Sequence, residues 1–296
     1  MRALTALVLP GALALALAPD AMTAARAQTL VNVEELLNRV GERVAEFYKI
    51  ANNVVCIETS TVQQLDFNNA PDGMARTVES ELRVEPEGGP APGEPAVLRK
   101  IRKVNGRAPR ERDKKDRAGC TDPNPLSTEP LAFLLPAHRA EYQFKTAGTA
   151  REKNRPVVVI DFTSVNRRSN PELIEDPGGH DDCFDWSGHV ASRGRIWVDA
   201  TSHDVIRVDR SIPGPVDVTV PVRLQRRHLL GGWVVIVRDD MTIRYRTVSF
   251  SDPDEVLLLP ESILSLTVMR GGLASARRSQ TFSDYKRFVT EGKVLD

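Results

Sequence analysis

The first regular pattern of apolar positions in the chain is that of an amphipathic helix over Val33–Ala51. Apolar residues recur there at steps of three and four, which places them on one face of a helix. Asn32 is placed to cap its N-terminus, Glu35 occupies the acidic position of a capping box, and Asn52-Asn53 can end it. A helix with a single apolar stripe must pack on another element, and we expect a sheet, because the segments that follow have extended character.

Period-two alternation predicts β-strands from Val54 onward. The clearest case is Val216–Leu224, where apolar and polar residues alternate over nine positions, and where Pro221 favours an edge strand because it has no amide to donate. We expect an antiparallel meander. Further alternating strands have their apolar positions at Ile243, Tyr245, Leu264, Leu266 and Val268.

Glycine-rich turns and polar stretches separate the predicted strands. Asn105-Gly106 is typical of a tight hairpin turn, and Gly231-Gly232 and Gly271-Gly272 are further candidates. Two polar stretches, residues 85–95 and 167–193, are rich in turn-forming residues. We interpret both as long loops of one domain, because extended segments of similar composition flank each of them.

The N-terminus has the pattern of a secretory signal peptide over Met1–Ala27. Arg2 supplies the positive charge, an apolar stretch runs over Ala3–Pro19, and Ala25-Arg26-Ala27 is a small-x-small cleavage site. The apolar stretch is interrupted and shorter than the roughly 20 residues that a membrane-spanning helix needs. The first cysteine, Cys56, lies far from the cleavage site, so a lipobox is missing. We therefore expect a periplasmic or secreted protein that does not span the membrane after processing.

The overall charge argues against nucleic acid as a partner. The chain has 40 basic and 40 acidic residues, whereas nucleic-acid-binding proteins typically show a basic stripe and a high pI. The strongest local bias is the basic cluster over Arg99–Arg117, which could meet anionic lipid headgroups or the acidic face of a partner. Acidic residues within the cluster dilute it, which favours a solvated hairpin.

The cysteines and one histidine-containing stretch are the candidates for cross-linking or metal chemistry. Cys56, Cys120 and Cys183 allow three disulfide pairings in an oxidising compartment, and a Cys120–Cys183 bridge would tie down two loop-like segments. The spacing of the nearby histidines and carboxylates matches no zinc pattern, so a solvated or disulfide-tied loop is favoured over a metal site. The candidate metal ligands are His180, Asp182 and His189.

Catalytic motifs are missing from the sequence. There is no G-x-S-x-G nucleophile elbow, no H-E-x-x-H motif and no glycine-rich phosphate loop. None of the 5 histidines accompanies a cysteine in a familiar catalytic signature. We therefore expect neither an enzyme nor a cofactor.

Several segments have a distinctive form. Gly194–Asp199 reads G-x-I-W-V-D, and Thr201–Arg207 then carries a hydrophobic pair and an arginine. Together with Leu259–Val268 and Gln280–Phe288, this hairpin resembles strands of LolA-like proteins, the superfamily of outer-membrane lipoprotein-sorting proteins, in which the last two segments are similar to the final strands. Shorter counterparts lie at Val104–Pro109 and Asn53–Thr59.

The resemblance implies an α+β fold over residues 28–296. Its main part would be a strongly curved antiparallel sheet, an incomplete barrel, with the N-terminal helix and a short helical lid packed on the concave side. The apolar run Leu131–Leu135, bounded by prolines, would be the lid. In the lipoprotein-carrier members the concavity holds acyl chains. This chain departs from them by its long loops, its cysteines and its lack of carrier-specific residues, so lipoprotein transport itself is not carried over.

We expect a non-enzymatic binding protein that shelters a hydrophobic ligand between sheet and helices, such as an acyl chain, a lipid or a lipoprotein segment. The alternative is an envelope protein–protein interaction or stress-sensor module, whose own side chains fill the concavity and whose surface is the 167–193 stretch with the basic cluster. A third hypothesis, a hydrolase or metal enzyme, requires the side chains of His180–His189 to converge in one cleft. The predicted cavity-lining residues, each of which can instead be plain core, are Val216, Val218, Val220, Val222, Leu224, Ile243, Tyr245, Leu264, Leu266, Leu131, Phe133 and Leu134.

Overall fold

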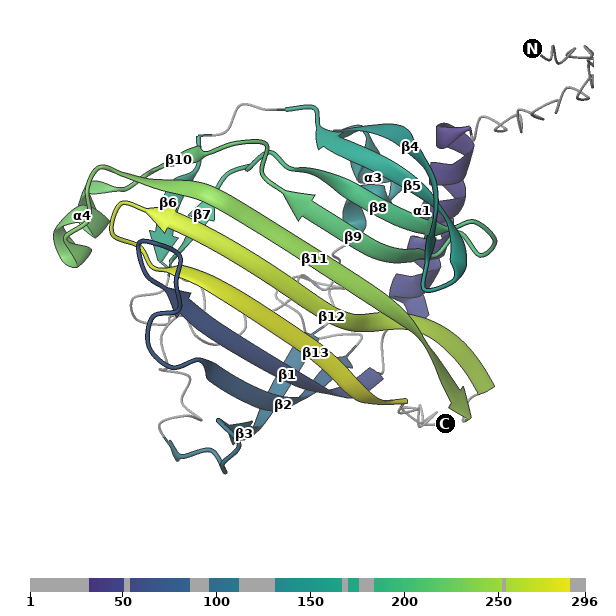
Figure 1. The fold of residues 1–296 in the computed structure, drawn as a ribbon, viewed down its shortest axis with the longest axis horizontal. Coiled ribbons are helices and arrows are strands. Elements are labelled where there is room, and N and C mark those ends of the chain that lie inside the picture. The colour runs from purple at the N-terminus through teal and green to yellow at the C-terminus, as the bar shows by residue number, and fades with distance from the viewer. Residues whose placement is uncertain are drawn as a thin grey trace, which may run out of the picture. The chain divides into compact units, whose positions relative to one another are not determined.

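The computed structural model describes residues 32–50, 54–85, 96–111, 131–166, 170–175, 184–251 and 254–287. These residues form a 13-stranded sheet and a few helices (Figure 1). The helices are α1 (Val33–Ile50), the 3-10 helix η1 (Ala132–Leu134), α3 (Pro136–Arg139) and α4 (Val222–His228). The strands are β1 (Val54–Leu65), β2 (Arg76–Glu85), β3 (Ala96–Val104), β4 (Tyr142–Glu152), β5 (Arg155–Ser164), β6 (Glu172–Glu175), β7 (Phe184–Ser187), β8 (Arg193–Asp199), β9 (Val205–Ser211), β10 (Val216–Thr219), β11 (Trp233–Ser251), β12 (Asp254–Arg270) and β13 (Ser275–Arg287).

The sheet is open and almost entirely antiparallel. Its main path runs β3-β2-β1-β13-β12-β11-β9-β8-β5-β4, and β10, β6 and β7 branch from β11. Only the short contact between β10 and β6 is parallel among the described strands. The long central strands β11 and β12 bend along their length (Figure 1), and their pairing shifts register at two places, which is where bulges increase twist. The predicted α+β class with an incomplete antiparallel barrel is confirmed.

The predicted N-terminal helix is confirmed as α1. Asn32 caps it, because its Oδ1 accepts hydrogen bonds from the amides of Glu34 at 3.1 Å and Glu35 at 3.4 Å. The carboxylate of Glu35 pairs with Arg39 one turn later at 2.6 Å. Among the described helices, none is long and apolar enough to cross a membrane.

The predicted nine-residue strand over Val216–Leu224 is only half right. The strand β10 ends at Thr219, and Pro221 is the residue before α4, where its missing amide costs no hydrogen bond. The valine alternation therefore crosses a boundary between strand and helix. Leu224 is still buried, because the helical turn directs it back onto the same core.

The predicted loop over residues 167–193 is also wrong in part. Within it, β6 and β7 pair antiparallel, and β8 begins at Arg193. Residues 86–95, most of the other predicted loop, lie outside the described residues. Asn105 and Gly106 do form the predicted tight turn, with φ values of 48° and 74°. Gly271-Gly272 joins β12 to β13 as predicted, whereas Gly231-Gly232 joins α4 to β11 and makes no hairpin.

One row of paired residues crosses the sheet and defines what we call the inner face. Starting at β1, the register joins Ser60 to Gln280, then Ile263, Ile243, Val208, Ile196 and Ile160 on successive strands. Every residue of this row is buried. The row is polar on β1 and β13, where Val62 and Phe282 are buried beside the polar positions, and it is apolar from β12 to β5. We call these two parts the polar half and the apolar half of the inner face.

Candidate functional site

The apolar half of the inner face lies under a layer of helices. The amphipathic helix α1 turns Leu36, Leu37, Val40 and Val44 inward, and all four are buried. Gly41 lets η1 and α3 approach closely, since a Cβ there would lie 3.1 Å from the carbonyl oxygen of Leu134. The helix layer is therefore held by backbone proximity as well as by apolar packing.

An aromatic cluster joins this helix layer to β4 and β5. The ring of Phe133 in η1 lies 4.7 Å from that of Phe162, 5.5 Å from that of Tyr142 and 6.5 Å from that of Phe144, measured between centroids. Such separations are typical of favourable aromatic pairs. Phe162 in turn covers Gly194, where a Cβ would lie only 2.7 Å from the ring. The rings fix the helical segment on the sheet.

A groove of about 570 Å³ lies between α1, α3 and the edge strand β4. This volume falls within the roughly 300–1,000 Å³ of typical small-molecule sites. Arg139 is the cation of the groove, and its Nη1 donates a hydrogen bond to Asn38 Oδ1 at 2.8 Å. The groove thus combines apolar side chains with one cation, Arg139, and one carboxylate, Glu34. Its lining residues are Val33, Glu34, Leu37, Asn38, Pro136, Arg139, Ala140 and Phe144.

The polar half of the inner face contains a buried network of polar side chains. Glu58 is 1% exposed, and its carboxylate accepts hydrogen bonds from Arg99 Nε at 2.6 Å and Gln280 Nε2 at 2.9 Å. Ser60, two residues along β1, has a buried hydroxyl with no hydrogen-bond partner among the described residues. A buried carboxylate is stable only while its partners are in place, so this network is sensitive to the loss of any member.

Cys56 and Tyr285 lie beside this network, and both have raised pKa values. Burial raises the pKa of the Cys56 thiol to about 12, and the charge of Glu58 adds to the effect. Burial also raises the pKa of Tyr285, whose hydroxyl donates a hydrogen bond to the carbonyl of Pro260 at 2.6 Å. A reactive cysteine requires a lowered pKa, so Cys56 does not fit a nucleophile.

A second hollow of about 510 Å³ lies over β5, β8, β9 and β11. Four of its lining residues, Asp161, Arg195, Asp209 and Thr242, directly follow or precede residues of the inner row, which points their side chains to the opposite face of the sheet. Asp161 pairs with Arg195 at 2.6 Å, and Asp209 pairs with Arg207 at 2.6 Å. The first pair joins the neighbouring strands β5 and β8, whereas the second lies within β9.

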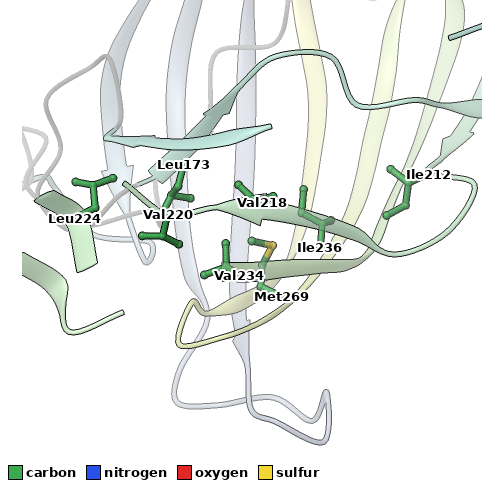
Figure 2. Packing of buried hydrophobic residues seen from close by; sticks show 8 residues of the cluster. All are labelled: Leu173, Ile212, Val218, Val220, Leu224, Val234, Ile236 and Met269. Carbon is green, nitrogen blue, oxygen red and sulfur yellow. The ribbon is translucent and has the colours of Figure 1, made fainter. Parts of the chain in front are cut away.

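The predicted cavity-lining residues of the 216–224 segment form a packed core instead of lining the groove. Figure 2 shows Val218, Val220 and Leu224 clustered with residues from β6, β11 and β12, and Val216 packs against the edge of this cluster. Val222 is 58% exposed on α4, so the prediction that it faces inward is wrong. The helical turn that begins after Pro221 directs its side chain outward.

The remaining predicted lining residues divide between core and surface. Ile243 and Tyr245 are buried, as are Leu131 and Leu134, and Phe133 belongs to the aromatic cluster. The prediction for β12 assigned the wrong alternate residues to the inner face. Ile263 pairs with Ile243 on that face, and Leu264 is 51% exposed. Leu266 is half-buried. Whether any of the buried residues contacts a ligand stays a prediction.

The predicted metal and disulfide residues lie largely outside the described residues. These are His180, Asp182, Cys120 and Cys183, while His189 is exposed. In the described part of the chain, no group of three or more histidine, cysteine or carboxylate side chains is placed to hold a metal ion. Cys56 has a free, buried thiol.

Sequence reasoning missed the groove because its walls come from three separate segments. Leu37 was correctly placed on the apolar stripe of the helix, but Phe144 and Ala140 were not singled out. The signal that could have found them is the alternation of Tyr142 and Phe144 with polar residues. Their meeting with α1 depends on the long-range pairing of β4 at the end of the sheet.

No protein-family model matches the chain, and no curated protein matches its sequence. Solved structures similar to it include a putative outer membrane lipoprotein-sorting protein domain from Vibrio parahaemolyticus, at 11% identity and a TM-score of 0.30, covering 90% of this chain and 95% of that one. A LolA superfamily protein from Nitrosomonas europaea has 11% identity and a TM-score of 0.30, covering 88% and 97%. A DUF1329 family protein from Desulfovibrio piger has 9% identity and a TM-score of 0.40, covering 87% and 94%. These include the superfamily that the sequence motifs resemble.

Proposed function

We propose that this chain is an exported, non-enzymatic binding protein that holds an acyl chain in the groove between α1, α3 and β4. In this proposal residues 1–27 are removed as a signal peptide, and residues 28–296 act as one domain in the periplasm or outside the cell. The acyl chain would belong to a lipid or to a lipoprotein segment. No covalent chemistry is needed, because shelter from water is itself the function.

The observation that carries the proposal is the chemistry of the groove walls. Val33, Leu37 and Phe144 offer apolar surface for a chain, and burial of each methylene group is worth about 0.8 kcal/mol. Arg139 supplies a positive group for a carboxylate or phosphate at the head of that chain. Apolar walls with a few placed polar groups are typical of ligand sites, and in this groove the anionic head would lie at Arg139 and away from the carboxylate of Glu34.

Native mass spectrometry with lipid extraction tests this proposal on the protein as the producing cell processes it. We expect a stoichiometric lipid in the gently purified protein, or binding of added fatty acid to the delipidated protein. The variant Ala140→Trp should fill the groove and abolish that binding. Ala137→Trp is the matched control and should bind normally, because Ala137 lies in α3, three residues before Ala140, and outside the groove lining.

Two outcomes would overturn the proposal. One is a protein that carries no lipid and binds no added fatty acid or lipopeptide, which would favour the interaction-module alternative. The other is equal binding by the Ala140→Trp and Ala137→Trp variants, which would place any bound lipid elsewhere on the molecule. Intact mass would first establish which N-terminus the purified protein has.

A further inference from the structure

One end of the sheet exposes an unusual set of large apolar side chains. Leu229, directly after α4, is 92% exposed, and Trp233, the first residue of β11, is 61% exposed. In the turn between β1 and β2, Met74 is 91% exposed and Phe67 is 79% exposed. We call these four residues the apolar tip. Clustered apolar exposure of this kind marks an interaction surface, whereas single exposed side chains are ordinary.

Direct contacts link the segments that carry the apolar tip. Arg270, at the end of β12, donates a hydrogen bond from Nη2 to the carbonyl of Phe67 at 3.1 Å. The next residue, Gly271, is so close to β11 that a Cβ there would lie 2.8 Å from the carbonyl of Trp233. The β1–β2 turn, the β12–β13 turn and α4 therefore meet at the same end of the sheet (Figure 1).

The frame behind the tip is rigid. Leu224 of α4 is fully buried in the core shown in Figure 2, and Gln225 Nε2 donates a hydrogen bond to the carbonyl of Val220 at 2.7 Å. Leu229 follows the helix with φ 55° and ψ 36°, a left-handed conformation that favours glycine or asparagine. A leucine at this position is both strained and exposed in the free protein, which points to a role outside it.

Guanidinium groups accompany the exposed apolar side chains. Arg226 is exposed on α4 and has no ion pair in the described part of the chain. Arg223 and Arg227 flank it and share Glu175 at 2.6 and 2.7 Å. Arg270 lies beside Phe67 and adds a further positive group. Exposed apolar side chains with arginines beside them suit a bilayer interface. There, apolar groups enter the boundary between headgroups and acyl chains, and cations contact lipid phosphates.

We propose that the apolar tip docks on the surface of a phospholipid bilayer. Trp233 and Leu229 would enter the interfacial region, where tryptophan is favoured, and Arg226 would meet lipid phosphates. The inference goes beyond the proposed ligand groove, which lies at the other end of the sheet with α1, α3 and β4 (Figure 1). A docked protein would thus keep its groove away from the membrane.

Flotation of the processed protein with protein-free vesicles tests the docking. We use vesicles of phosphatidylethanolamine with phosphatidylglycerol, and vesicles of phosphatidylcholine alone. The variant Leu229→Asn/Trp233→Thr keeps residues that suit the local backbone and should lower the bound-to-free ratio by about tenfold or more. Arg226→Gln should weaken binding to the anionic vesicles alone. Val256→Thr/Leu264→Thr removes two exposed apolar side chains of β12 outside the tip, and should bind as the wild type does.

Each remaining outcome counts against docking to lipid. Failure of the wild type to float with either vesicle, or equal loss in the β12 control, overturns the proposal. Flotation only with envelope vesicles that retain their native proteins also overturns it, and assigns the tip to a protein partner. The Leu229→Asn/Trp233→Thr variant should still bind fatty acid in the groove. The vesicle assay and the fatty-acid assay therefore show separately whether the docking proposal or the groove proposal has failed.

Discussion

The two halves of the inner face are equally buried but are held together by different physics. From Ile263 to Ile160 the cross-sheet row is apolar and lies on the side that the helix layer covers. At Ser60 and Gln280 it is polar, and Gln280 donates a hydrogen bond to the buried Glu58, two residues from Ser60 on β1. Truncation of an apolar side chain removes the packing contacts of that side chain. Removal of a polar partner also leaves another buried polar group without its hydrogen bond. Substitutions in the polar half should therefore destabilise the protein more than substitutions in the apolar half.

The largest effect on stability is expected for Glu58→Met, which keeps the side-chain volume but removes the carboxylate. We expect a loss of about 3–5 kcal/mol in the free energy of unfolding, because Arg99 and Gln280 lose their acceptor. Urea denaturation measures the loss. The double variant Glu58→Met/Arg99→Met should be less destabilised than the single one, since no cation is then left without its partner. Additive losses would show that the two side chains act independently.

Truncation in the apolar half is the matched perturbation. Ile196→Ala should cost about 3 kcal/mol, as removal of a fully buried isoleucine usually does, and Ile196→Val about 1 kcal/mol. The graded response is the expected signature of apolar packing, and thermal or urea unfolding of both variants checks it. A cost for Ile196→Ala above that of Glu58→Met would reverse the ranking of the two halves.

A pH titration provides the smallest and most specific test of the polar half. The pKa of Cys56 is raised to about 12 in the folded protein, while an exposed thiol titrates at about 8.5. The unfolded chain therefore loses this proton first, and the folded state loses stability as the pH rises above about 8.5, by up to about 1.4 kcal/mol per pH unit. Between pH 8 and pH 10 we expect about 2 kcal/mol of extra loss in the reduced wild type relative to Cys56→Ala. Parallel pH profiles of the two proteins would contradict it.

The contrast also explains which parts of the fold the sequence could predict. The helix α1 was predictable because its apolar stripe, its cap and its boundaries are all local. In β1 the inward positions include Glu58 and Ser60 while outward ones include Ile57, so alternation gives no clean apolar face. The inward phase of β12 was likewise set by its pairing with β11 and not by its own pattern.

The candidate groove was predictable only in outline. A helix stripe covering a sheet and an apolar run at Leu131–Leu135 were both visible in the sequence. The sequence did not show that β4 is the last strand of the path, and this position brings Phe144 next to Leu37. The segment with Pro221 and Val222 shows the opposite case. Its strand-like alternation is strong, but the chain changes there from strand to helix. Segments whose structure depends on remote partners are the ones that local patterns describe least well.

The pairing of β1 with β13 sets the order in which this chain can fold. Glu58 bonds a glutamine 222 positions further along, so the first strand waits unpaired on that side until the last one arrives. Contacts of such long range form slowly, and a nascent chain cannot make them before its C-terminal strand has been synthesised. Formation of the polar half is therefore expected to be the last step of folding.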